Sequence, residues 1–169
     1  ANGAAAGSEF QVSNFTGSYY HSISSVTSLD DGGFVVTWTG DNNGYDDILG
    51  QRYDANGAAA GSEFQVSNNS GHTSTAHTPS VTSLVDGGFV VTWIGDNNGS
   101  LGISGQCYDA NGAAFGSEFQ VSNNARSYWN SVTSLDDGGF VVTWTGDNNG
   151  HEDILGQRYD TNGAAVGSE

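Results

Sequence analysis

The chain repeats one pattern of about fifty residues three times, and this repeat limits its fold more than any other feature. SEFQVSN stands at 8–14, 62–68 and 117–123, and DGGFVVTW stands at 31–38, 86–93 and 137–144. The units span about 1–54, 55–109 and 110–160, with a partial fourth at 161–169. A unit of this size cannot bury its own apolar face and needs neighbours. The chain is therefore predicted to be one domain of packed repeats.

Composition excludes several classes of function. The net charge is −16, and the basic residues are three arginines and no lysine. Nucleic-acid binding is excluded, because nothing neutralises phosphates. Membrane insertion is also excluded, because no apolar stretch approaches the roughly 18 residues of a spanning helix. The single cysteine, Cys107, allows no internal disulfide and stands where the other repeats carry Arg52 and Arg158.

Each repeat predicts four short antiparallel strands. In the first complete set of four, period-2 alternation covers 25–29, 34–39, 47–53 and 63–67, the last of which belongs to the start of the second unit. Gly and Asn-Gly turns separate these segments, as hairpins require. An all-β fold follows, built as a β-propeller of four-stranded meander blades, with three blades in the chain. A β-trefoil is the alternative. Trp38, Trp93 and Trp144 are expected in the core.

Three blades leave two apolar sheet faces uncovered. We expect either a longer array or two chains that close a six-bladed ring by two-fold symmetry. The segment 161–169 (TNGAAVGSE) repeats 1–9 (ANGAAAGSE). This overlap predicts a homo-oligomer, a C2 dimer in which the ends of one copy complete the broken blade of the other.

An acidic loop is predicted between the second and third strands, at 41–47 and 147–153. It has oxygen ligands at alternating positions, a Gly for the bend and a later carboxylate, a pattern that suits Ca²⁺. The same Asp-Asn-Asn-Gly letters also make a good turn without a metal. Both interpretations stay open, and the second repeat carries Gly102 in place of the last acid.

The segments that cross between repeats (14–24, 68–79 and 123–130) vary in sequence while the strands stay constant. Variable loops on a constant scaffold are typical of a binding surface. Their aromatic and histidine side chains could stack on a sugar ring and bond its hydroxyls, or could simply pack between blades. The candidate ligand-binding residues are Tyr19, Tyr20, His21, His72, His77, Tyr128 and Trp129. Arg52 and Arg158 are expected to pair with nearby acids such as Asp54 or Asp160.

No catalytic motif is found: a GxSxG elbow and a metal-type histidine cluster are absent from the sequence. The chain is therefore predicted to be non-enzymatic.

The phrase DGGFVVTW…GDNNG…DILGQRYDANGAAAGSEFQVS resembles tandem repeats of large secreted bacterial surface proteins that accompany calcium-binding RTX regions. The stretch 41–48 is also similar to the cation loop of FG-GAP/VCBS propeller repeats. This resemblance implies calcium ligands at Asp41, Asn43, Asp47, Asp147, Asn149 and Asp153.

The predicted function is a secreted, extracellular binding module. It would recognise carbohydrate or another cell-surface ligand in a lectin-like manner, with Ca²⁺ as a possible aid. The alternative is a purely structural repeat that self-assembles in a surface layer or adhesin.

Overall fold

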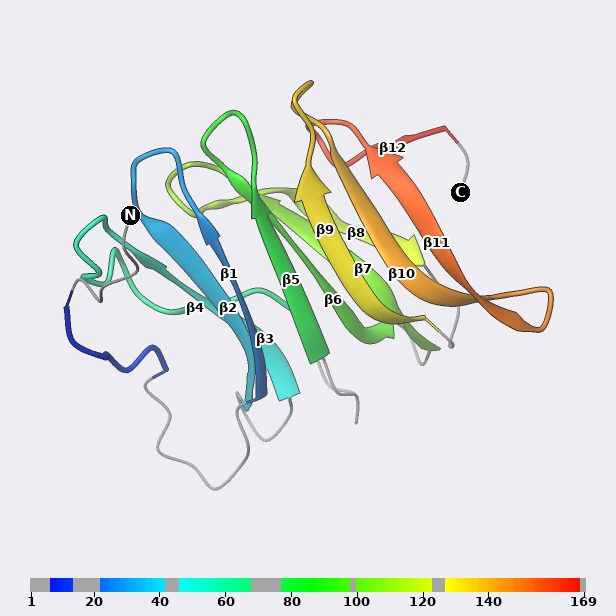
Figure 1. Cartoon of the computed structure of the whole chain (residues 1–169), viewed down its shortest axis with the longest axis horizontal. Coiled ribbons are helices and arrows are strands. Elements are labelled where there is room, and N and C mark those ends of the chain that lie inside the picture. Colours follow the sequence, from blue (N-terminus) through cyan, green and yellow to red (C-terminus); the bar gives the residue numbers. More distant parts are fainter. Residues whose placement is uncertain are drawn as a thin grey trace.

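The computed structural model describes residues 7–13, 22–41, 46–67, 77–97, 100–122 and 127–167. These residues form three four-stranded antiparallel sheets and no helix (Figure 1), and each sheet takes its last strand from the start of the following repeat unit. The all-β prediction is confirmed. The sheets stand side by side without closing into a ring, so that the first and the third each keep one open face. None of the described residues belongs to a helix with the length and hydrophobicity needed to span a bilayer.

Each sheet is a meander in which neighbouring strands are also neighbours in the sequence. The first sheet contains β1 (Ser22–Ser28), β2 (Phe34–Asp41), β3 (Asp46–Tyr53) and β4 (Phe64–Gln65). The second contains β5 (His77–Ser83), β6 (Phe89–Asn97), β7 (Ser100–Tyr108) and β8 (Ala114–Ser122). The third contains β9 (Tyr128–Ser134), β10 (Phe140–Asn148), β11 (His151–Tyr159) and β12 (Ala165–Val166).

The central hairpins are longer than the sequence predicted. The strand expected at 34–39 extends to Asp41, and its partner starts at Asp46, so the expected polar loop is shorter. In the third repeat Asn149 and Gly150 alone connect β10 and β11, with φ of 56° and 85°, values that suit a two-residue primed turn. Backbone pairing continues past the last apolar residue, because Asp and Asn also donate and accept in the ladder.

Two turns in each sheet, before the second strand and after the third, are stabilised by hydrogen bonds to an aspartate side chain. Asp31 accepts a hydrogen bond from the backbone N–H of Gly33 at 2.8 Å. Asp54 accepts from the N–H groups of Asn56 and Ala58 at 2.8 and 2.9 Å, and these bonds lower the pKa of its carboxyl. The same bonds occur in the other two repeats. The turn chemistry read from the sequence is thus repeated in the structure.

Arg52 and Arg158 pair with nearby acids as predicted, but the partners are not the Asp54 and Asp160 named as examples. Arg52 bonds to Asp31 at 3.2 Å, and Arg158 bonds to Asp137. Asp54 and Asp160 are instead occupied by the N–H groups of their own turns. The pairing of β2 with β3 places Arg52 opposite the start of β2, beside the turn that carries Asp31.

The first strands of the three sheets lie next to one another, β5 between β1 and β9 (Figure 1). The repeated Ser-Val-Thr-Ser motif joins them. The N–H of Val81 donates to the hydroxyl of Ser25 at 3.2 Å, and the N–H of Val132 donates to that of Ser80 at 3.1 Å. A serine hydroxyl of each sheet therefore satisfies a backbone donor of the next.

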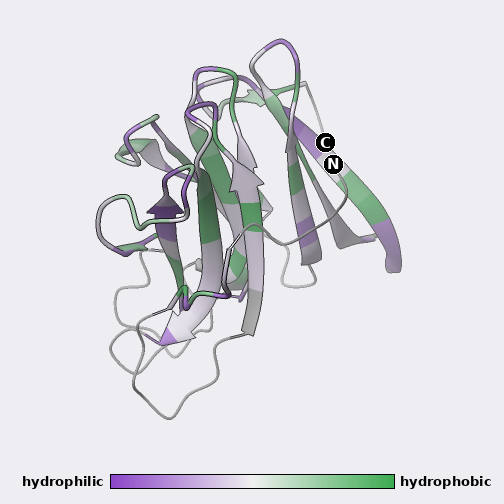
Figure 2. Ribbon diagram, turned by 60° about the vertical axis from the view of Figure 1, so that its left-hand side comes forward, coloured by the Kyte–Doolittle hydropathy of each residue, from purple (hydrophilic) through white to green (hydrophobic). Residues whose placement is uncertain are grey.

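Two apolar cores fill the spaces between adjacent sheets. In the first core, Val35 and Ile48 of the first sheet contact the face of the second sheet that carries Phe89 and Trp93. The second core repeats this arrangement between the second and third sheets. The three repeated tryptophans, Trp38, Trp93 and Trp144, are buried as predicted. Figure 2 shows hydrophobic stretches along the strands and hydrophilic stretches at their ends and turns.

Candidate functional site

The starts of β5 and β9 lie at the same end of the molecule as the β6–β7 and β10–β11 hairpins. The strand register shows this, because His77 is opposite Ile94 and Tyr128 is opposite Thr145, both late in their strands. Tyr19, Tyr20, His21 and His72 lie outside the described residues.

Tyr128 and Trp129 form an exposed aromatic pair. Trp129 is 73% exposed, and its ring centroid lies 6.1 Å from that of Tyr128 at a tilt of 56°. Trp129 has φ 48°, and Thr78 has φ 49° at the equivalent position of the second repeat. Each occupies an irregularity in the pairing with the next strand. The strained backbone is thus part of the repeat, while the side chain that it presents varies.

Asn130 fixes the strand next to this pair. Its side-chain amide donates to the carbonyl oxygen of Thr78 at 2.7 Å, and its carbonyl oxygen accepts from the hydroxyl of Thr92 at 2.6 Å. The first bond joins the starts of β5 and β9, and the second joins β9 to Thr92 on β6 through the side-chain oxygen of Asn130. His77, the fifth crossing-segment candidate, is half-buried on β5.

Of the predicted calcium ligands in the first repeat, Asp47 is buried and hydrogen-bonded. Its Oδ1 accepts from the hydroxyl of Ser67 at 3.0 Å. Burial raises the pKa of Asp47, and the charges of Asp41 and Asp46 add to the rise, while the bonds from Ser67 and Gln65 oppose it. Asn43 lies outside the described residues.

The third repeat uses its acidic segment as a turn. Oδ1 of Asp147 accepts from the N–H of Gly150 at 2.7 Å, Asn149 adopts the left-handed backbone of that turn, and Asp153 is exposed. Across the described parts of the chain, no three His, Cys, Asp or Glu side chains come together as a metal site would need. The calcium site stays a prediction.

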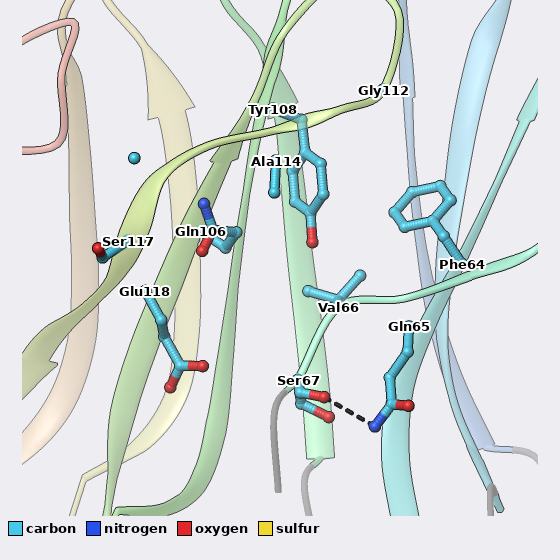
Figure 3. Close-up of a pocket in the computed structure, with 11 residues that line it drawn as sticks. Phe64, Gln65, Val66, Ser67, Gln106, Tyr108, Gly112, Ala114, Ser117 and Glu118 are labelled. Carbon is cyan, nitrogen blue, oxygen red and sulfur yellow. Dashed lines mark hydrogen bonds between the residues drawn. The ribbon is translucent and has the colours of Figure 1, made fainter.

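A cleft of about 700 Å³ that the sequence did not predict lies between the outer edges of the first and second sheets (Figure 3). The segment from Phe64 to Ser67 lines one side, and residues of β7 and β8, including Glu118, line the other. The hydroxyl of Tyr108 points into the cleft, and burial raises its pKa, so this hydroxyl stays neutral. The only sequence signal for this cleft is that SEFQVS and GQxYD recur together.

Cys107 is not a candidate nucleophile. The thiol is buried in the second core, and burial raises its pKa to about 11. The thiolate, which is the reactive form, is therefore disfavoured at neutral pH. The cysteine replaces the arginine of the other repeats and, as a small apolar side chain, lies beside Gly163 of the next sheet as Arg52 lies beside Gly112.

Side chains at equivalent positions of the repeat are exposed on the open faces of the first and third sheets and buried on the faces between sheets. Ile154 on β11 is 75% exposed, whereas its equivalents Ile48 and Ile103 are fully buried. Val26 on β1 is 62% exposed, whereas Val81 and Val132 are 6% and 8% exposed. The sequence positions are the same, so the difference follows from the neighbouring sheet, which the described residues supply for the inner positions and not for the outer ones.

The chain matches no known protein family by sequence, and no curated protein matches it. Among solved structures, its fold is similar to a crystal structure of a protein of unknown function from Dyadobacter fermentans DSM 18053. The TM-score is 0.57 at 10% identity, over 86% of this chain and 53% of the other. The chain thus spans about half of the solved structure. At this identity the likeness concerns the fold alone.

Proposed function

We propose that this chain is a non-enzymatic repeat module that associates with further copies of itself, the third sheet of one copy packing against the first sheet of another. The observation that carries the proposal is the 75% exposure of Ile154, an apolar side chain whose two equivalents are fully buried between sheets. Two copies joined in this way at both ends would make a two-fold ring of six sheets, a closed propeller.

The two open faces are complementary halves of the interface that the chain forms twice internally. In the first core, Val35 and Ile48 of one sheet meet Phe89 and Val91 of the next. The third sheet presents the equivalents of the first pair, Val141 and Ile154. The first sheet presents the equivalents of the second pair, Phe34 and Val36, both only half-buried. The preferred occupant of each face is therefore the other face.

Charge and shape at the rim support the same pairing. In the internal interface, Arg52 lies across the turn of the second sheet, and a β-carbon at Gly112 would be 3.0 Å from its Cδ. Arg158 is the exposed equivalent of Arg52, and Gly57 is the open equivalent of Gly112. A second copy would place Arg158 over the turn of Asp54, so that opposite charges meet.

The mass of the chain in solution tests this proposal. We expect a dimer of about twice the 17.5 kDa chain by light scattering over a concentration series. Ile154→Asp should weaken association by at least about tenfold, because burying such a side chain contributes about 1.5–3 kcal/mol per interface. Val85→Asp is the matched control: Val85 is exposed, and the other repeats carry Asp30 and Asp136 there. A wild-type monomer at every concentration would contradict the proposal.

A second candidate function is recognition of carbohydrate through Tyr128 and Trp129, supported by the exposure of the Trp129 ring on a strained backbone that the repeat holds in place. An extracellular module of this kind would stack the indole on a sugar ring. Trp129→Ala should abolish binding on a glycan array, while Leu101→Ala, another exposed apolar residue, should leave it unchanged. The array is read with calcium and with a chelator. Absence of wild-type binding in both conditions would remove this candidate.

A further inference from the structure

We propose that residues 10–13 of one copy continue the outer strand of the third sheet of another copy beyond β12, pairing with β11 at Ile154–Gly156. This inference rests on the proposed self-association and specifies its contact: the association is a strand addition as well as a packing of two faces. The occupant of the β11 edge is a second copy of this chain, and the segment that enters is its own N-terminal Phe-Gln-Val-Ser.

The N-terminal segment already lies where such a strand belongs. In the internal interface, the Phe64 ring of the first sheet packs on Tyr108 of the second, with centroids 5.4 Å apart. Phe10 packs on Tyr53 of the first sheet with the same 5.4 Å separation. Phe10 therefore lies against the first sheet as Phe64, on the last strand of the first sheet, lies against the second.

The third sheet lacks this strand along half of β11. In the first sheet, Gln65 is opposite Leu49, and the N–H of Val66 donates to the carbonyl oxygen of Ile48 at 2.7 Å. In the third sheet, pairing between β11 and β12 covers only Arg158 and Tyr159. Among the residues that the structure describes, none pairs with Ile154–Gly156 on this side. Such an unpaired edge can accept another strand.

A glycine marks the place of the missing phenylalanine. The ring of Phe64 covers Gly50 so closely that a β-carbon there would be 2.6 Å from it, and Phe119 covers Gly105 at 2.5 Å. At the equivalent Gly156, the nearest atom to a β-carbon belongs to Thr143 at 3.4 Å, an ordinary contact. The glycine is repeated in the third sheet, but no described ring covers it. Phe10 of a second copy fits this place.

The serine that follows β4 in the first sheet also has an equivalent in the incoming segment. The hydroxyl of Ser67 accepts from the N–H of Ile48 and donates to Asp47, both at 3.0 Å. Ser13 is the equivalent serine of the incoming segment, and Ile154 and Asp153 are the equivalent partners on β11. Asp153 is exposed here, whereas Asp47 is buried beneath its serine. Strand addition would cover Asp153 with the hydroxyl of Ser13.

Cysteine cross-linking tests the register. By the internal pairing of Leu49 with Gln65, Leu155 should face Gln11 of the other copy, so the variant with Gln11→Cys and Leu155→Cys should form disulfide-linked dimers under mild oxidation. A chain with Leu49→Cys and Gln65→Cys is the positive control and should link within one molecule. Gln11→Cys with Glu152→Cys places the second thiol on the opposite face of β11 and should link no more than either single variant.

Two substitutions separate strand addition from simple packing of faces. Gly156→Ala should weaken association by at least about tenfold, because the added carbon occupies the place of Phe10, and should leave the melting temperature of the dissociated chain unchanged. Val12→Pro should weaken association relative to Val12→Ala, because only proline removes the N–H that Ile154 would accept.

The outcomes distinguish the two proposals. A wild-type monomer overturns both the self-association and the strand addition. A wild-type dimer that shows no Gln11–Leu155 cross-link, and that Gly156→Ala leaves intact, overturns strand addition while the packing of faces stands. A dimer with the cross-link in register and sensitivity to Gly156→Ala supports both.

Discussion

Phe89→Ala is expected to lower the free energy of unfolding by about 3–5 kcal/mol, a large share of the stability of a domain of this size. Phe89 is fully buried between the first and second sheets and stacks on Tyr108 with centroids 4.8 Å apart and planes 8° apart. Its removal leaves a cavity in the first core, and the paired strands around it cannot collapse far. Urea unfolding followed by tryptophan fluorescence measures the change.

Phe34→Ala is the matched comparison, because Phe34 occupies the same position of the first repeat and stacks on Tyr53 at 5.0 Å and 12°. It is only half-buried, since none of the sheets that the structure describes covers it. We expect a loss clearly smaller than that of Phe89→Ala. Both substitutions are measured in the Ile154→Asp background, at a concentration where light scattering gives the mass of the single chain, so that association does not contribute. Equal losses would contradict the description of the first sheet as an open end.

Gly88→Ala is expected to have the second large effect, at the upper end of about 1–3 kcal/mol. A β-carbon at Gly88 would lie 2.3 Å from the carbonyl oxygen of Tyr108. The obstacle is backbone of the paired strand, so no side-chain rotation relieves it, and β6 must separate from β7 at its first residues. The change is read as a fall in the urea midpoint.

Gly156→Ala in the same background serves as the control, because its added carbon meets only ordinary contacts within one copy. It should change the urea midpoint little. If Gly88→Ala were equally mild, the turn before β6 would have to be looser than the 3.0 Å bond from Gly88 N–H to Asp86 indicates.

Most of the local structure could be predicted from the sequence, because it depends on short-range chemistry. Period-2 alternation predicted the strands around Val35 and Ile48, and Asp-Gly-Gly and Asn-Gly predicted the hairpin turns. Strand ends were less well predicted, since polar residues such as Asp41 and Asp46 continue the ladder without an apolar signal.

The candidate site was harder to predict, because its properties come from contacts between repeats. The sequence showed that Trp129 stands in a variable segment. Only the packed structure shows that its backbone repeats the strained geometry of Thr78 and that Asn130 fixes the neighbouring strand. For the cleft beside Tyr108 the sequence offers nothing beyond the joint recurrence of SEFQVS and GQxYD, since the cleft forms where two sheets meet.

The amino-acid pattern by itself determines that this protein is a repeat of four-stranded antiparallel sheets, because alternation and turn chemistry act within a few residues of the chain. It cannot distinguish Ile154 from Ile48 or Val26 from Val81, since each pair occupies the same position in the same motif. The tertiary structure alone decides that one member is buried and the other exposed. The physical reason is that burial depends on the neighbouring sheet, and no described sheet lies against the outer faces of the first and third sheets.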